Sequence, residues 1–242
     1  MLKKLALLVA VIVLCACTAQ PQLPVAVDSS ALLQSDKTMG VYLDTVPEPR
    51  LSLPGADCLL CIAVASAANS STSNHVKTFE TEDISNLKAD VLTLLGSNGR
   101  EAFDIDTPIE LSDLPKHSSE DPIATRSDYS GLGLELGVDR LFVLDIDAVG
   151  AVRNYASYVP TSPPLAWVTG RSYIVDVTTN TYLWYEPIDI RLGAEGEWDE
   201  PPEYPGLTNS YYQVLEMLRD RVLSPLSTGG MENDSQSAKP VP

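Results

Sequence analysis

A short apolar run followed by regular alternation restricts the folds open to this chain. Residues 141–144 are all apolar, and the next four residues alternate between Asp and apolar side chains. This pattern indicates a central β-strand whose far end leaves the core. Residues 167–177 and 182–192 are two longer strand-like segments separated by a short polar turn. They predict a β-hairpin, so the second half of the chain supplies most of a sheet.

Helical spacing of apolar residues occurs in three other places. Thr81 is a favourable N-cap for a helix that Gly96 and Gly99 end. Residues 127–136 predict a second helix, and residues 211–223 predict a third, with Asn209 or Ser210 as its cap.

Two short strands complete the predicted elements, over residues 39–45 and 103–109. The resulting order is β-α-β-α-β-β-β-α. Helices interleave with strands early, and a meander closes the sheet. We therefore predict an α+β fold with a mixed β-sheet and helices packed on one face.

The N-terminus has the features of an export signal. Lys3 and Lys4 precede an apolar run over residues 5–14, which is too short to cross a bilayer as a finished helix. Small residues follow the run. This predicts a signal peptide over residues 1–16.

The residues around Cys17 resemble a bacterial lipoprotein signal, with Leu14 three residues before the cysteine and Ala16 directly before it. The resemblance implies acyl chains (palmitate) on Cys17, which anchor the protein in a membrane. Thr18, rather than Asp, follows the cysteine, which by resemblance to sorted lipoproteins favours the outer membrane, with the domain facing the periplasm. The alternative is a secreted protein without lipid.

Composition restricts the partners. The formal net charge is −17, which argues against nucleic acid or a bare anionic membrane surface as the binding partner. A basic protein partner fits this charge better.

Composition along the chain divides it into four parts. The signal peptide (1–16) is followed by a lipidated N-terminus and flexible tether (17–37), rich in Gln, Pro, Ser and Ala. Residues 38–226 form a single periplasmic α+β domain, which is long enough to bury a core. Residues 227–242 form a disordered tail.

Five segments carry resemblances to known lipoproteins. Residues 137–144 and 173–184 resemble the fold shared by the curli-secretion lipoprotein, the N-terminal domain of TolB and the lipoprotein activator of a penicillin-binding protein. Residues 54–61, 158–162 and 196–202 are similar to a group of uncharacterised proteobacterial lipoproteins. These resemblances imply a fold and no activity.

Cys58 and Cys61 form a C-x-x-C pair that is compatible with three interpretations. The first interpretation is a structural disulfide in an oxidising periplasm, and the second is a pair of buried thiols. The third is a functional pair, either a redox couple or part of a metal site. A redox pair is expected at a helix N-terminus after a strand, whereas Leu-Pro-Gly precedes this motif. A zinc site needs two further ligands, and the only histidines are His75 and His117.

Residues 59–68 are apolar or small and too few to span a membrane. They predict either a buried helix or loop, or an apolar surface that meets the membrane, a partner or a second copy.

An acidic, proline-stiffened loop follows the hairpin. Trp198 and Tyr204 are candidate anchors for a protein partner, together with Glu197, Asp199 and Glu200. In the alternative interpretation the aromatic rings fold back on the sheet and the acids form a solvated rim.

The sequence contains none of the common catalytic signatures, such as G-x-S-x-G, a P-loop or H-E-x-x-H. We predict a non-enzymatic protein without catalytic residues, cofactor or metal, which acts as a protein-binding accessory factor of the cell envelope. One alternative is an oligomeric secretion or assembly component resembling the curli-secretion lipoprotein. The other is a periplasmic thiol–disulfide redox protein.

Overall fold

The computed structural model describes residues 21–28, 36–200 and 203–227. The predicted signal peptide, Cys17 and nearly all of the predicted tail lie outside these residues, so those assignments stay predictions.

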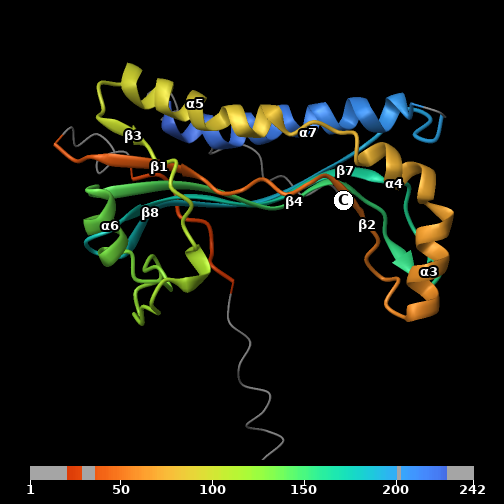
Figure 1. Ribbon diagram of the computed structural model, residues 1–242, viewed down its shortest axis with the longest axis horizontal. Helices are drawn as coiled ribbons and strands as arrows, with labels where there is room; N and C mark the ends of the chain where they lie inside the picture. The colour runs from red at the N-terminus through yellow and green to blue at the C-terminus, as the bar shows by residue number, and fades with distance from the viewer. Residues whose placement is uncertain (1–20, 29–35, 201–202, 228–242) are drawn as a thin grey trace, which may run out of the picture.

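A mixed sheet with the strand order β3-β1-β4-β7-β8 forms the centre of the domain (Figure 1). Its middle strand, β4 (Arg140–Val152), is parallel to β1 (Met39–Leu43) and antiparallel to β7 (Leu165–Asp176). Outside them, β3 (Ala102–Asp104) is parallel to β1, and β8 (Thr181–Gly193) is antiparallel to β7.

Two long helices cover one face of this sheet, α5 (Glu82–Ser97) and α7 (Pro205–Leu223) (Figure 1). Side chains alternate between the two faces of a strand. Phe142 and Leu144 of β4 therefore point the same way, and both belong to the cluster that the two helices bury. This cluster is the main core of the domain.

The other face of the sheet packs against a second cluster. Leu141 and Val143 of β4 lie there, with Tyr129 and with Leu132 and Leu136 of helix α6 (Ser130–Leu136). The hydroxyl groups of Tyr129 and Tyr173 are 2.9 Å apart, so these buried phenols satisfy each other.

One end of the sheet carries several small elements. Strand β2 (Arg50–Ser52) pairs with the last residues of β4, and helices α3 (Leu59–Ala68) and α4 (Ser70–Val76) follow it (Figure 1). Strands β5 (Tyr155–Ala156) and β6 (Val159–Pro160) form a separate hairpin. Two 3-10 helices lie elsewhere, at Leu111–Asp113 and Ser224–Leu226.

The predicted α+β class, with a mixed sheet and packed helices, is confirmed. The predicted strands over 167–177 and 182–192 correspond to β7 and β8 within two residues at each end. The strand predicted over 103–109 is confined to β3, whose pairing with β1 ends at Val41.

The last helix begins at Pro205, so the prediction that Asn209 or Ser210 caps it is wrong. Proline suits the first position of a helix, because its fixed φ is helical and no N–H is left without a partner. Ser210 is buried inside α7, where its hydroxyl donates to the carbonyl oxygen of Gly206 at 2.9 Å.

Residues 21–28, which we call the N-terminal segment, lie against the outer edge of β8. The Val25 N–H donates to the Tyr185 carbonyl at 2.9 Å, and the Tyr185 N–H donates to the Val25 carbonyl at 3.0 Å. The Asp28 N–H donates to the Leu183 carbonyl at 3.0 Å. These bonds satisfy edge groups that β7 does not reach. This part of the range 17–37 is therefore attached to the domain, whereas the sequence predicted a flexible tether throughout.

Candidate functional site

Three distant sequence segments meet at one end of the sheet. They are the stretches over 54–61, 158–162 and 196–200, which carry the resemblance to the uncharacterised lipoproteins. We call the region around them, with helices α3 and α4 and the start of α7, the α3 end (Figure 1). The contacts described below join these segments.

Arg153 directly follows β4 and contacts the second and third of these segments and the residue that ends α3. Its Nη1 donates to Asn69 Oδ1 at 2.8 Å, and its Nε donates to the Ser162 carbonyl at 3.1 Å. Its guanidinium lies over the Trp198 ring, 4.9 Å from the ring centroid. One cation therefore links the junction of α3 and α4, the β5–β6 hairpin region and the acidic loop.

Asn69 is the buried partner in this network. It lies between α3 and α4, and its Nδ2 donates to the Ala65 carbonyl at 2.6 Å and to the Tyr155 hydroxyl at 2.5 Å. Tyr155 packs in turn against Cys61. The amide thus has partners for both its oxygen and its nitrogen, which a buried polar group requires.

Cys58 and Cys61 are joined in a disulfide, the first of the three interpretations. Cys58 is the N-cap of α3 and is exposed, whereas Cys61 is buried in the first turn. The pair therefore lies at the N-terminus of a helix, a position that the sequence, with Leu-Pro-Gly before the motif, does not predict. Gly55 makes this arrangement possible, because its φ is +88° and a Cβ there would collide with the Tyr155 carbonyl.

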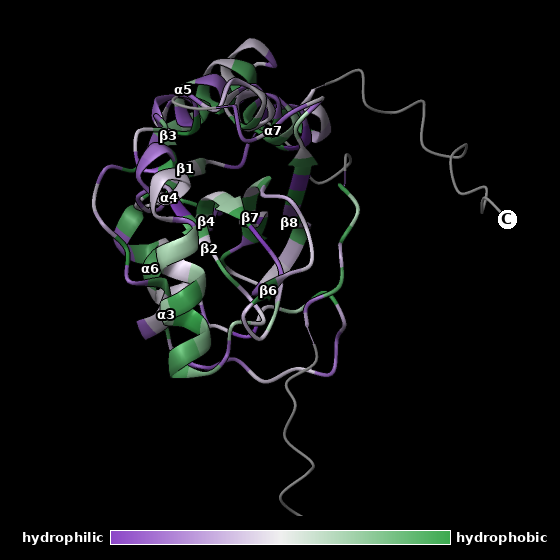
Figure 2. Cartoon of the chain, turned by 90° about the vertical axis from the view of Figure 1, so that its right-hand side faces the viewer, coloured by the Kyte–Doolittle hydropathy of each residue, from purple (hydrophilic) through white to green (hydrophobic). Residues whose placement is uncertain are grey.

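Helix α3 buries only a narrow stripe and leaves large apolar side chains outside. Cys61 and Ala65 are its buried residues, whereas Leu59 is 91% and Leu60 72% exposed. We define the α3 patch as the exposed apolar residues of α3 and the adjacent hairpin: Leu59, Leu60, Ile62, Val64, Tyr158 and Val159. Figure 2 shows α3 as a mostly hydrophobic helix at the edge of the molecule. For residues 59–68 the sequence predicts either a buried helix or loop or an apolar surface. The structure shows an exposed apolar surface on a helix.

The acidic loop folds its aromatic rings inward. Tyr204 is only 8% exposed, and its ring stacks on that of half-buried Trp198 with 6.5 Å between the centroids. Tyr204 is thus part of the core rather than an exposed anchor, because the helix start at Pro205 turns it toward His75. Glu197, Asp199 and Glu200 are exposed, and we call these three the acidic rim. In the described part of the chain no salt bridge involves them.

His75 packs beneath the loop. Its Nε2 lies 2.7 Å from the Thr208 hydroxyl, and its ring contacts those of Phe79 and Tyr204. Burial lowers the pKa of His75 below its ordinary value of 6.5, and the nearby Glu203 carboxylate opposes this shift more weakly. The uncharged imidazole is therefore favoured in the folded protein.

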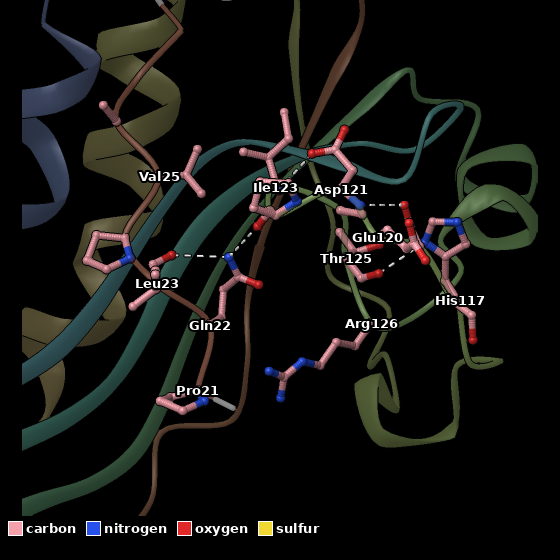
Figure 3. A pocket seen from close by; sticks show the side chains of 16 residues that line it. Pro21, Gln22, Leu23, Val25, His117, Glu120, Asp121, Ile123, Thr125 and Arg126 are labelled. Atoms are coloured by element: carbon pink, nitrogen blue, oxygen red, sulfur yellow. Dashed lines mark hydrogen bonds between the residues drawn. The ribbon is translucent and has the colours of Figure 1, made fainter. Parts of the chain in front are cut away.

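A hollow of about 910 Å³ lies beside the N-terminal segment (Figure 3). The segment forms one wall and residues 117–126 form the other. Gln22 Nε2 donates to the Pro122 carbonyl at 3.2 Å, and His117 Nδ1 lies 3.0 Å from the Thr125 carbonyl (Figure 3). The hydrogen bond from Gln22 to Pro122 thus attaches the N-terminal segment to the domain at a second place.

Within residues 21–28, 36–200 and 203–227, no three His, Cys, Asp or Glu side chains are grouped so that they could hold a metal ion. In the same residues, every helix is too short or too polar to cross a membrane. Both findings concern only the described residues.

Sequence reasoning missed Arg153, Asn69 and Tyr155. A signal was present in the isolated polar positions, since Arg153 directly follows an apolar strand and Asn69 directly follows an apolar helix. Their meeting depends on contacts across more than eighty residues of chain.

No known protein-family model matches this sequence. No curated protein sequence matches it either. Among solved structures, the chain is similar to the putative neuraminyllactose-binding hemagglutinin homolog from Helicobacter pylori, with 10% identity, a TM-score of 0.38, and 89% of this chain and 91% of that chain covered. It is similar to lipoprotein GNA1162 from Neisseria meningitidis, with 12% identity, a TM-score of 0.31, and coverages of 77% and 95%. It is also similar to the PelC dodecamer from Paraburkholderia phytofirmans, with 11% identity, a TM-score of 0.30, and coverages of 87% and 94%. At these values the similarities identify neither a family nor an activity.

Replacing Arg153 tests whether the network holds the α3 end together. We expect Arg153→Met to lower the free energy of unfolding by about 1–3 kcal/mol, because the Asn69 amide oxygen loses its donor inside the protein. Arg191→Met is the matched control, since Arg191 lies over Trp167 at an exposed ion pair with Asp189. We expect Arg191→Met to lower the free energy of unfolding by about 0.2–1 kcal/mol. Urea unfolding measures both, and equal losses would contradict a special role for Arg153.

The environment of His75 predicts a pH dependence. The folded protein holds this histidine with a lowered pKa, so between that pKa and 6.5 the unfolded chain binds more protons. Stability contributed by His75 is therefore complete above about pH 6.5 and is lost as the pH falls below it. We expect the His75→Gln variant to lack the loss of stability that His75 causes as the pH falls below about 6.5. Urea midpoints from pH 7.5 to 5.5 measure it, and parallel curves for the two proteins would contradict the assignment.

Proposed function

We propose that this chain is a non-enzymatic lipoprotein of the cell envelope, held in the outer membrane by lipid on Cys17, with its domain in the periplasm. It serves there as a protein-binding accessory factor. The observation that carries the proposal is the short connection between the lipoprotein signal and the folded domain. Only three residues, Thr18, Ala19 and Gln20, separate Cys17 from the N-terminal segment that is bonded to β8.

The acidic rim supports the protein-binding part of the proposal. Its three carboxylates are exposed, while the aromatic rings beneath them are fixed by the core and by Arg153. A preformed loop loses little entropy when it binds. In a chain with a net charge of −17, a basic surface on another envelope protein suits this rim.

The α3 patch favours a second candidate, the oligomeric secretion or assembly component. Contiguous apolar residues on a protein surface commonly mark an interface. A third candidate, the thiol–disulfide redox protein, has support from the exposed position of Cys58 at the N-cap of α3. We rank it last because, in the described residues, no hydrogen bond or salt bridge joins a Lys or Arg side chain to either cysteine.

Substitution of Cys17 tests the anchor. We expect the mature protein from membranes to begin at an acylated Cys17, and Cys17→Ser to leave the membrane fraction because no lipid can be attached. Cys15→Ser is the matched control, since it changes the neighbouring cysteine of the signal and should keep the lipid. Intact-mass spectrometry with fractionation is the measurement. A wild-type protein without acyl mass would support the secreted alternative instead.

Charge reversal tests the acidic rim. The triple variant Glu197→Lys, Asp199→Lys, Glu200→Lys should lose its crosslinks to envelope proteins in living cells, because a basic partner would then be repelled. The control reverses three exposed acids on helices α6 and α7, Glu135, Glu216 and Asp220, for the same change in net charge. Equal loss in both variants would point to net charge alone. Retention of every crosslink in the rim variant would reject the rim as the contact.

A further inference from the structure

We propose that helix α3 dips into the same membrane that holds Cys17, with the leucines at its N-terminal end among the acyl chains. This inference rests on the proposed function, since it assumes a lipid on Cys17. It adds a second membrane contact and a fixed orientation of the domain.

The first argument is the exposure of α3. In an ordinary surface helix the largest apolar side chains face the core. Helix α3 has the opposite arrangement, because cysteine and alanine face inward while Leu59 and Leu60 face outward. The two leucines are at the very start of the helix, next to the exposed end of the disulfide. Such a surface is stabilised when something apolar covers it.

The second argument is the length of chain between the lipid and the domain. Cys17 and Pro21 are four residues apart, so their Cα atoms are separated by at most about 14 Å. Pro21 begins the N-terminal segment, which Val25 and Asp28 fasten to β8 and Gln22 fastens to Pro122. A lipid on Cys17 therefore keeps the bilayer surface close to this side of the domain.

The third argument is that α3 points toward that side. In Figure 1 the first described residues end at the lower side of the molecule, and the N-terminal end of α3 projects downward as well. Figure 2, turned by 90°, again shows α3 at the lower end, with α5 and α7 at the top. The two views together place the N-terminal end of α3 on the same side as the first described residues, and the long helices α5 and α7 on the far side.

The fourth argument is charge. A strongly acidic protein is repelled by anionic lipid, so an uncharged part of its surface enters such a membrane at the lowest cost. From Cys58 to Val76 the sequence has no Asp, Glu, Lys or Arg. Asp57 borders this stretch and would lie at the level of the headgroups. With ten residues, α3 is too short to span, which leaves insertion into the interface.

Depth-dependent fluorescence quenching tests this contact in the full-length lipidated protein. Leu60→Trp, at an exposed position, adds a reporter without disturbing the core. The protein is incorporated into vesicles of phosphatidylethanolamine and phosphatidylglycerol with brominated acyl chains. We expect a loss of the added fluorescence, relative to vesicles without bromine. The control is Met217→Trp, on the exposed side of α7 at the far side of the molecule, which should show no such loss.

The possible failures can be told apart. Mass spectrometry on the same sample that finds no acyl group on Cys17 overturns the proposed anchor, and this inference with it. A lipidated, vesicle-bound protein in which Leu60→Trp is quenched no more than Met217→Trp overturns the inference alone. If Leu60→Trp is shielded from aqueous iodide but not quenched by bromine, and light scattering gives a multimer, a second copy covers α3 and the membrane contact is rejected.

Discussion

The pairing of β4 along both of its edges is the constraint on which the rest of the domain depends. One edge pairs with β7, and the other pairs first with β1 and then, farther along, with β2. A slip of one residue would exchange the faces that carry Phe142 and Leu141, and with them the two hydrophobic clusters. Strand β4 extends beyond the end of β1. Its last residues lead to Arg153, where the α3 end is assembled. The candidate site is thus an extension of the central strand.

Periodicity was sufficient to predict the parts of the fold that one continuous segment determines. The β7–β8 hairpin and the long helix α5 are such parts, since their apolar spacing repeats over many residues. The apolar spacing places the start of the last helix at residue 211, whereas α7 begins at Pro205, where proline is favourable. Tyr204 was misjudged because its burial depends on His75, more than a hundred residues away. The network around Arg153 could not be predicted for the same reason.

The α3 end combines two surfaces of opposite chemistry. The α3 patch is apolar and uncharged, and the acidic rim is polar and negative. Arg153 fixes their relative position, because it bonds to Asn69 at the base of α3 and lies over Trp198 of the loop. Under the two proposals, a partner that docks on the rim is therefore held at a set distance from the bilayer. A stiff connection of this kind differs from a domain that swings freely on a long tether.

The N-terminal segment has a consequence for how the protein is made. Val25 and Asp28 close part of the outer edge of β8, and residues 123 and 124 close the neighbouring part. Farther along, Pro187 lacks an N–H, and Asp189 and Arg191 place charges on the strand. Under the proposed export, the N-terminal segment crosses the membrane early and β8 crosses late. Until β8 arrives, the sheet has an open edge that could template aggregation in a crowded compartment, so the nascent domain depends on rapid closure or on a chaperone that shields it.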